Sequence, residues 1–242
     1  VVKAHSLLAA RCEVDADRIG MTGISWGGYL TCLVAGLDPR FRAAAPIYGC
    51  GFVSEESTWT ENGAFAGLTE SQAAIWRENF DPGRVLHRAA LPMLWLNGTN
   101  DFAYWPSVWQ KSAATAAGPR QLCMKLRWPH GHIPEAEEAR ELVHFFNAHL
   151  AGATPMVSVS TPQIEHGRMV ASYGDERPLG GATLIMTPNR TLWPTREWFA
   201  LPAEIDAPSR QVSAAFPREA SAAFLSLLSA DWLTTSSDIL FF

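Results

Sequence analysis

A serine placed between two glycines is the strongest chemical signal in this sequence. Gly23-Ile24-Ser25-Trp26-Gly27 fits G-x-S-x-G, the pattern of a sharp strand-to-helix turn that exposes the hydroxyl of its serine. The turn is so tight that the residues two before and two after the serine must be small, and it strains the serine backbone. We therefore predict that Ser25 is a nucleophile. The N–H of Trp26, at the start of the helix, would face a developing oxyanion.

A nucleophilic serine needs a base, and the base needs an acid to orient it. In enzymes that use this turn, the acid and then the histidine follow the serine along the chain. We predict that the acid is Asp101, which comes just after an apolar, strand-like run. Two histidines, His130 and His132, follow the next such run. We favour His132 as the base, because Gly131 precedes it and a proline-opened helix follows it, and we keep His130 as the alternative.

The composition bounds the class of protein. Of the 242 residues, 48% are apolar and 18% are charged, which predicts a sizeable core. The net charge of −5 argues against nucleic-acid partners and against anionic membrane surfaces. The four cysteines are scattered, so we expect free thiols. The pair His130 and His132 lacks a third ligand at useful spacing, so we predict neither a metal nor another cofactor.

Alternating strand and helix patterns predict a parallel sheet for the first 150 residues, covered on both faces. The expected strands are residues 18–22, 41–50, 91–97 and 121–128, and the expected helices are 1–10, 26–37, 71–80, 104–117 and 134–150. Catalytic loops gather at the carboxyl ends of the strands in such sheets. Ser25, Asp101 and the histidine pair would therefore meet at one edge.

The pattern changes near residue 152. Beyond it, short strand-like runs are separated by clusters of Pro, Gly, Asn and Asp, which suggests an all-β sandwich. The runs are residues 156–160, 168–173, 182–186, 197–201, 210–216, 222–228 and 238–242. We predict a catalytic domain over residues 1–151 and a β-sandwich of immunoglobulin or fibronectin type over residues 152–242. The second domain would bind glycan or pack against the first.

Three segments together resemble the acetylxylan-esterase-like branch of the α/β-hydrolase superfamily, close to prolyl-oligopeptidase-like hydrolases: GISWGGYLT, PMLWLNGTNDFAYWP and WPHGH. The resemblance covers about residues 12–150. It implies hydrolysis of carboxylic esters, often deacetylation of plant polysaccharides by exported bacterial enzymes, and hence a secreted or periplasmic location. By position, Ser25 is similar to the family nucleophile, Asp101 to its acid and His132 to its base.

One departure from this family concerns the start of the chain. Only 24 residues precede Ser25, so the first four strands of such a sheet, and the loop that donates a second oxyanion N–H, have no counterpart. Loss of one such donor costs about 2.7–4 kcal/mol of transition-state stabilisation. The strand before Ser25 would also expose an edge that favours aggregation. We therefore expect this chain to be the C-terminal part of a longer protein, with a whole triad and an incomplete site.

Aromatic residues near the predicted catalytic loops bear on the substrate. Trp26, Trp59, Tyr104 and Trp105 could stack on sugar rings or pack in the interior. We favour a serine esterase acting on small-molecule or polysaccharide esters. The alternatives are a serine peptidase with the same triad and a binding module without catalysis.

Overall fold

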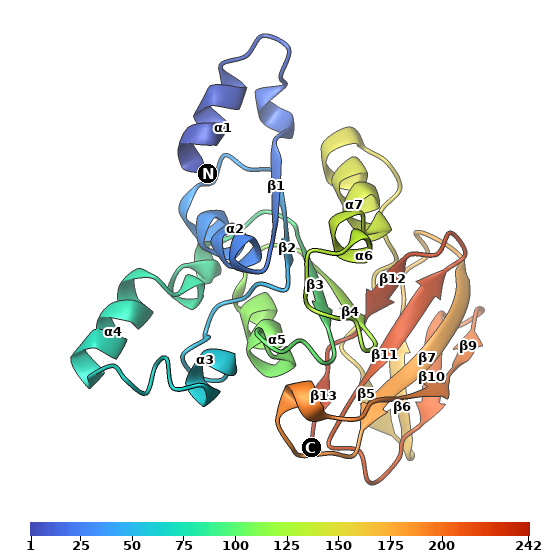
Figure 1. Cartoon of the computed structure of the whole chain (residues 1–242). Coiled ribbons are helices and arrows are strands. Elements are labelled where there is room, and N and C mark those ends of the chain that lie inside the picture. Colours follow the sequence, from blue (N-terminus) through green and yellow to red (C-terminus); the bar gives the residue numbers. More distant parts are fainter.

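The computed structural model describes residues 1–242 and contains one parallel and two antiparallel sheets (Figure 1). The parallel sheet has the order β1-β2-β3-β4. The antiparallel sheets have the orders β5-β6-β10-β9 and β12-β11-β7-β8, and β13 also pairs with β11. This arrangement confirms the predicted fold class, which is part of an α/β-hydrolase sheet followed by a β-rich region, here residues 153–242.

The four parallel strands lie close to their predicted positions: β1 (Gly20–Ile24), β2 (Ala43–Ile47), β3 (Met93–Gly98) and β4 (Arg120–Lys125). Every residue of β2 and β3 is buried, as expected for central strands covered on both faces. The register pairs Ile24 with Ile47 and Gly98 with Lys125. The carboxyl ends of the strands therefore meet at one edge of the sheet, as predicted.

The helices cover both faces of this sheet, with α2 and α5 on one face and α7 on the other (Figure 1). Their bounds are α1 (Val2–Ala9), α2 (Trp26–Leu37), α3 (Thr58–Glu61), α4 (Glu70–Asn79), α5 (Pro106–Thr115), α6 (Pro134–Glu137) and α7 (Arg140–Ala151). The single helix predicted over residues 134–150 is broken at Ala139, whose ψ of 120° is not helical. After the break, Glu141 lies inside the protein, where it pairs with Lys125.

The β-rich region contains more strands than the apolar runs predicted. Its strands are β5 (Gln163–Glu165), β6 (Arg168–Ser172), β7 (Leu179–Thr187), β8 (Phe199–Pro202), β9 (Glu204–Asp206), β10 (Gln211–Ala215), β11 (Ala222–Ser229), β12 (Thr234–Ser236) and β13 (Leu240–Phe241). The run 156–160 was wrongly predicted as a strand, because it forms only an isolated bridge between Val159 and Tyr173. Every residue of β5 and β9 is exposed and β12 is polar, so none of them has the apolar alternation that marks a strand.

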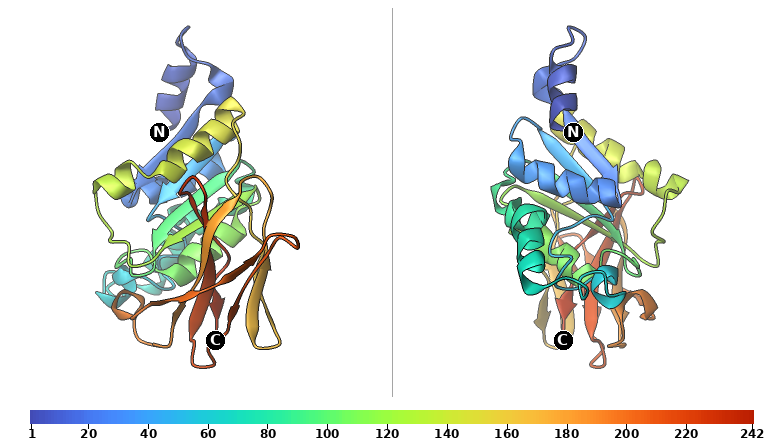
Figure 2. Two further views of the ribbon diagram at one scale, coloured as in Figure 1. Left: turned by 90° about the vertical axis from the view of Figure 1, so that its right-hand side faces the viewer. Right: turned by 60° about the vertical axis from the view of Figure 1, so that its left-hand side comes forward.

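Two hydrophobic cores hold the molecule together. The larger contains 42 buried residues and combines side chains of the parallel sheet, such as Trp95, with Trp198 and Phe224 of the β-rich region. The smaller contains 11 buried residues and fills the space between the two antiparallel sheets. The β-rich region therefore packs closely against the parallel sheet (Figure 2). A domain boundary near residue 152 stays a prediction. None of the helices is both long and apolar enough to cross a lipid bilayer.

The outer edge of β4 is covered by side chains of β12. The hydroxyl of Ser236 accepts a hydrogen bond from the Met124 N–H at 2.9 Å and lies 3.2 Å from the Met124 carbonyl oxygen, to which it donates. The side-chain amide of Gln121 donates to Thr235 Oγ1 at 3.0 Å. These contacts satisfy backbone groups that an exposed sheet edge would leave unpaired.

Candidate active site

Ser25 lies in a sharp turn between β1 and α2. Its backbone has φ 57° and ψ −115°, a region that a residue with a side chain rarely adopts. Its N–H donates to the carbonyl of Ile47 at 2.9 Å, which fixes the turn to the end of β2. A Cβ at Gly23 would lie 2.5 Å from the Gly27 carbonyl, so Gly23 must be glycine. The expectation for Gly27 was wrong, because a Cβ there would meet no atom within 4 Å.

Asp101 is fully buried just beyond the end of β3. Its Oδ1 accepts hydrogen bonds from the N–H groups of Ala103 at 2.7 Å and Tyr104 at 2.8 Å. Its Oδ2 lies 2.8 Å from Nδ1 of His130. The loop backbone therefore orients the carboxylate and leaves one oxygen for the histidine.

His130, and not His132, joins the acid to the serine. The Nδ1 atom of His130 faces Asp101, and its Nε2 lies 2.8 Å from Ser25 Oγ. The side chain of His132 is 71% exposed, with its Nδ1 3.2 Å from Glu137 Oε1. The preference for His132 was therefore wrong, and the alternative His130 has the required geometry.

The path of the loop explains the error. Arg127 has a positive φ of 52°, and its N–H donates to Thr99 Oγ1 at 2.9 Å, so the chain turns sharply after β4. The carbonyl of Pro129 is then held by the Tyr48 hydroxyl at 2.8 Å. The chain reaches the catalytic edge at His130 and is exposed again two residues later. The helix that follows begins with a proline and so marks where the next element starts. It does not indicate which of the two histidine rings faces the sheet.

Three aromatic rings surround the imidazole of His130. Its ring centroid lies 4.7 Å from that of Tyr48, 4.8 Å from Phe102 and 6.1 Å from Tyr104. Burial raises the pKa of Tyr48 far above its ordinary value, so its phenol stays protonated and donates. Sequence reasoning missed Tyr48 and Phe102. Their positions directly after β2 and directly after Asp101 are the signals that could have identified them.

An apolar pocket of about 270 Å³ has the residue after Ser25 in its lining. Trp26, which follows Ser25, forms one wall, and its ring is 49% exposed. As the first residue of α2, Trp26 has a backbone N–H without a partner inside the helix. Apolar side chains alone line the pocket: Trp26, Val53, Trp59, Ala64, Phe65, Leu68 and Trp76.

Two of the aromatic residues predicted to bind substrate lie inside the protein. Tyr104 is 0% exposed and Trp105 is 2% exposed, so neither offers a free face to a sugar ring. The prediction was therefore wrong for these two residues. Tyr104 instead packs between Trp59 and His130. No group of three or more His, Cys, Asp or Glu side chains is placed to hold a metal ion.

The β-rich region contacts both catalytic loops through the segment that includes η4 (Trp193–Thr195). The Asn100 amide, next to Asp101, donates to the carbonyl of Pro194 at 3.2 Å and to that of Arg196 at 2.7 Å. The Arg127 guanidinium, in the histidine loop, donates to the carbonyl of Trp198. The acid loop and the histidine loop are therefore both hydrogen-bonded to the same segment.

Comparisons with known proteins agree with the fold of the parallel-sheet region. The model described as the prolyl oligopeptidase family matches residues 1–152. An acetyl xylan esterase from Paenibacillus sp. R4 is 25% identical, with a TM-score of 0.53 over 62% of this chain and 51% of that chain. A puromycin-hydrolyzing peptidase from Mycobacterium tuberculosis is 22% identical, with a TM-score of 0.52 over 62% of this chain and 24% of that chain. The chain thus spans about half the length of the first and a quarter of the second.

Proposed function

Because this chain belongs to the prolyl oligopeptidase family, we propose that it is a serine hydrolase that cleaves carboxylic esters through an acyl-enzyme at Ser25. One observation carries the proposal: the His130 ring bridges Ser25 Oγ and Asp101 Oδ2, at 2.8 Å on each side. This is the arrangement of nucleophile, base and orienting acid that acyl transfer requires.

The first half of the proposed reaction acylates the serine. Asp101 accepts the Nδ1–H of His130, so the neutral ring presents Nε2 as an acceptor to the hydroxyl of Ser25. As Oγ attacks the acyl carbon, Nε2 takes its proton, and the carboxylate stabilises the imidazolium. The backbone N–H of Trp26 donates to the oxyanion that forms on the acyl oxygen.

The second half releases the product acid. Acylation ends when the imidazolium gives its proton to the leaving alcohol and the acyl group stays on Oγ. Water then attacks the acyl carbon while Nε2 takes a proton from it, and the same proton returns to Oγ when the acyl bond breaks. The enzyme ends as it began, and one ester and one water yield one acid and one alcohol.

We propose acetyl esters of carbohydrates as the first substrate class to test, on the likeness to the acetyl xylan esterase. The apolar pocket that Trp26 lines supports a substrate with an apolar group there. An acetyl methyl group is small enough to enter it. Trp26 is partly exposed, and its ring could stack against the sugar that forms the alcohol part of the substrate ester.

Peptide-bond hydrolysis is the second candidate. Family membership favours it, and an apolar pocket could hold a peptide side chain as well as an acyl group. The two candidates differ in leaving group, because an amine is a poorer leaving group than an alcohol and depends more on protonation by His130.

A substrate panel tests the proposal and separates the candidates. We expect purified protein to react with a fluorophosphonate probe at Ser25 and to hydrolyse p-nitrophenyl acetate and acetylated xylo-oligosaccharides faster than peptide anilides. Ser25→Ala is the matched control and should abolish both labelling and turnover.

Three outcomes would change the conclusion. Faster cleavage of the anilides would support the peptidase. Cleavage of p-nitrophenyl acetate without release of acetate from the oligosaccharides would contradict the carbohydrate substrate alone. Failure of the probe to label Ser25 in folded protein would contradict catalysis and favour a binding module.

A further inference from the structure

We infer that Tyr48 is a positioning residue that holds His130 in reach of Ser25 and Asp101. The inference rests on the proposed function, because it concerns the base of that reaction. Tyr48 comes directly after β2, whose last residue, Ile47, accepts the N–H of Ser25. The tyrosine therefore lies at the catalytic edge of the sheet, beside the nucleophile in the strand order.

Tyr48 is held in an unusual conformation. Its φ is 54°, in the left-handed region that bulky residues avoid, and its side chain is completely buried. Its N–H donates to the carbonyl of Leu96 at 3.0 Å, so the strained residue is still hydrogen-bonded to β3. Strain of this kind persists only where surrounding contacts maintain it, and it is found most often at functional sites.

The side chain of Tyr48 contacts three consecutive residues of the histidine loop. Its ring centroid lies 4.8 Å from that of Trp128 and 4.7 Å from that of His130. Its hydroxyl donates to the carbonyl of Pro129, between them, at 2.8 Å. One tyrosine thus fixes both the backbone before the catalytic histidine and one face of its imidazole.

Little else holds this part of the loop. Across residues 129–132, the carbonyl of Pro129 is the only backbone group that forms a hydrogen bond within the protein, and Tyr48 supplies it. The remaining polar contacts of these residues are those of the two histidine rings. Without the tyrosine hydroxyl, no hydrogen bond would hold the backbone of residues 129–132, and His130 would keep only its ring contacts and its bonds to Ser25 and Asp101.

The expected effect follows from the precision that acyl transfer demands. A displacement of about 1 Å at a catalytic group can lower the rate about 100-fold. Tyr48→Phe keeps the ring on the imidazole and removes the hydroxyl, so we expect kcat to fall about 10- to 100-fold with little change in KM. Tyr48→Leu removes both contacts and should lower kcat further.

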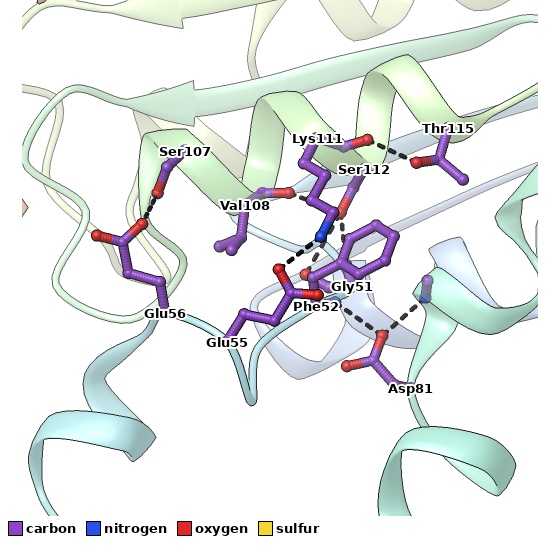
Figure 3. Close-up of polar contacts among 11 residues, drawn as sticks. Gly51, Phe52, Glu55, Glu56, Asp81, Ser107, Val108, Lys111, Ser112 and Thr115 are labelled. Carbon is purple, nitrogen blue, oxygen red and sulfur yellow. Dashed lines mark hydrogen bonds and ion pairs between the residues drawn. The ribbon is translucent and has the colours of Figure 1, made fainter. Parts of the chain in front are cut away.

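The test uses the full chain with p-nitrophenyl acetate and includes Ser112→Ala as the matched control. Ser112 is also buried, and its hydroxyl accepts from the Gly51 N–H at 2.9 Å and donates to the Val108 carbonyl at 2.7 Å (Figure 3). It lies on α5 and takes no part in the proposed reaction. Its loss should lower Tm at least as much as Tyr48→Phe but leave kcat unchanged.

A second readout does not need turnover. The proton between His130 Nδ1 and Asp101 gives a low-field NMR signal when it is shielded from exchange, and we expect this signal to weaken or vanish in Tyr48→Phe and to persist in Ser112→Ala. Wild-type kcat and signal in Tyr48→Phe would overturn the inference. So would equal losses of kcat in both variants, because these would reflect stability alone. If the wild type showed this NMR signal but no turnover, the proposed function would be contradicted. The effect of Tyr48→Phe on the signal would still test the positioning role.

Discussion

At the scale of single residues, two buried aspartates have opposite surroundings. Both carboxylate oxygens of Asp101 have partners. In Asp81, Oδ1 accepts from the N–H groups of Phe52 and Gly83 at 2.7 Å each, whereas Oδ2 is buried without a partner (Figure 3). Burial is the main cause that raises the pKa of Asp81 above its ordinary value. Asp81 therefore organises the turn after β2, and its burial disfavours the charged form of its carboxyl.

The raised pKa of this buried carboxyl predicts a pH-dependent effect of Asp81→Asn on stability. The folded protein holds the Asp81 proton more tightly than the unfolded chain does. Its free energy of unfolding therefore falls as the pH rises from the ordinary aspartate pKa, about 3.9, through the raised pKa of the folded protein. The asparagine side chain of the variant keeps an oxygen that accepts from the same two backbone N–H groups, and it carries no charge. We expect the difference in free energy of unfolding, variant minus wild type, to increase with pH across this interval in urea titrations.

Asp81→Ala is the control for the backbone bonds. It leaves the N–H groups of Phe52 and Gly83 unpaired and should destabilise the protein by about 1–3 kcal/mol. A pH-independent difference between Asp81→Asn and wild type would contradict the account of the buried charge.

Sequence reasoning located the turn at Ser25 and the place of Asp101 after β3 from local signals, although it gave Gly27 a steric role that the structure does not show. The glycine spacing around Ser25 and the position of Asp101 after an apolar strand both depend on neighbours in the chain. The choice between His130 and His132 depends on Tyr48, 82 residues before the first of them in sequence and against it in space. No local pattern contains that contact, so the sequence left two candidates and favoured the wrong one.

At the scale of elements, the segment around η4 is hydrogen-bonded to the loops that carry Asp101 and His130. Asn100 donates to two carbonyl groups of this segment, and it lies next to Asp101. Asn100→Ala would leave both carbonyls without these donors and loosen the acid loop. We expect a loss of about 1–3 kcal/mol in the free energy of unfolding and a several-fold fall in kcat, measured by urea titration and ester hydrolysis.

Asn79→Ala is the matched control for Asn100→Ala. Its amide also donates to a backbone carbonyl, that of Ile75 at 2.9 Å, but it is exposed on α4. This variant should keep wild-type kcat and lose little stability. Equal effects of the two substitutions, or full activity in Asn100→Ala, would contradict a role of the η4 segment in shaping the site.

The elements that sequence reasoning missed have a common physical cause. The bounds of α2 follow from helical spacing, and the buried strands follow from continuous apolar runs. Strands β5, β9 and β12 are held by their neighbours and not by burial of apolar side chains of their own, so they give no periodic signal. The break before α7 is followed by Glu141, which pairs with Lys125 of β4, a contact that no local pattern contains.

At the scale of the whole molecule, the larger core joins the parallel sheet to the β-rich region. Phe224 of β11 is fully buried in this core and contacts Trp198, with 6.0 Å between ring centroids. The two regions should therefore unfold together. We expect circular dichroism, tryptophan fluorescence and calorimetry to report one coincident transition.

Phe224→Ala tests this cooperation. Removing a buried phenylalanine costs about 3–5 kcal/mol, and the loss should shift the whole transition to lower temperature without splitting it. Two transitions, of which only one moved, would show that the regions unfold independently.

The turnover of p-nitrophenyl acetate by His130→Ala and His132→Ala tests most directly whether Ser25, His130 and Asp101 form a working triad. Loss of the base should lower kcat by about 10⁴-fold or more in His130→Ala. His132→Ala should keep kcat within about twofold of wild type, because surface substitutions away from a site have small effects. Near-normal turnover by folded His130→Ala, or a comparable loss in His132→Ala alone, would contradict the proposed triad.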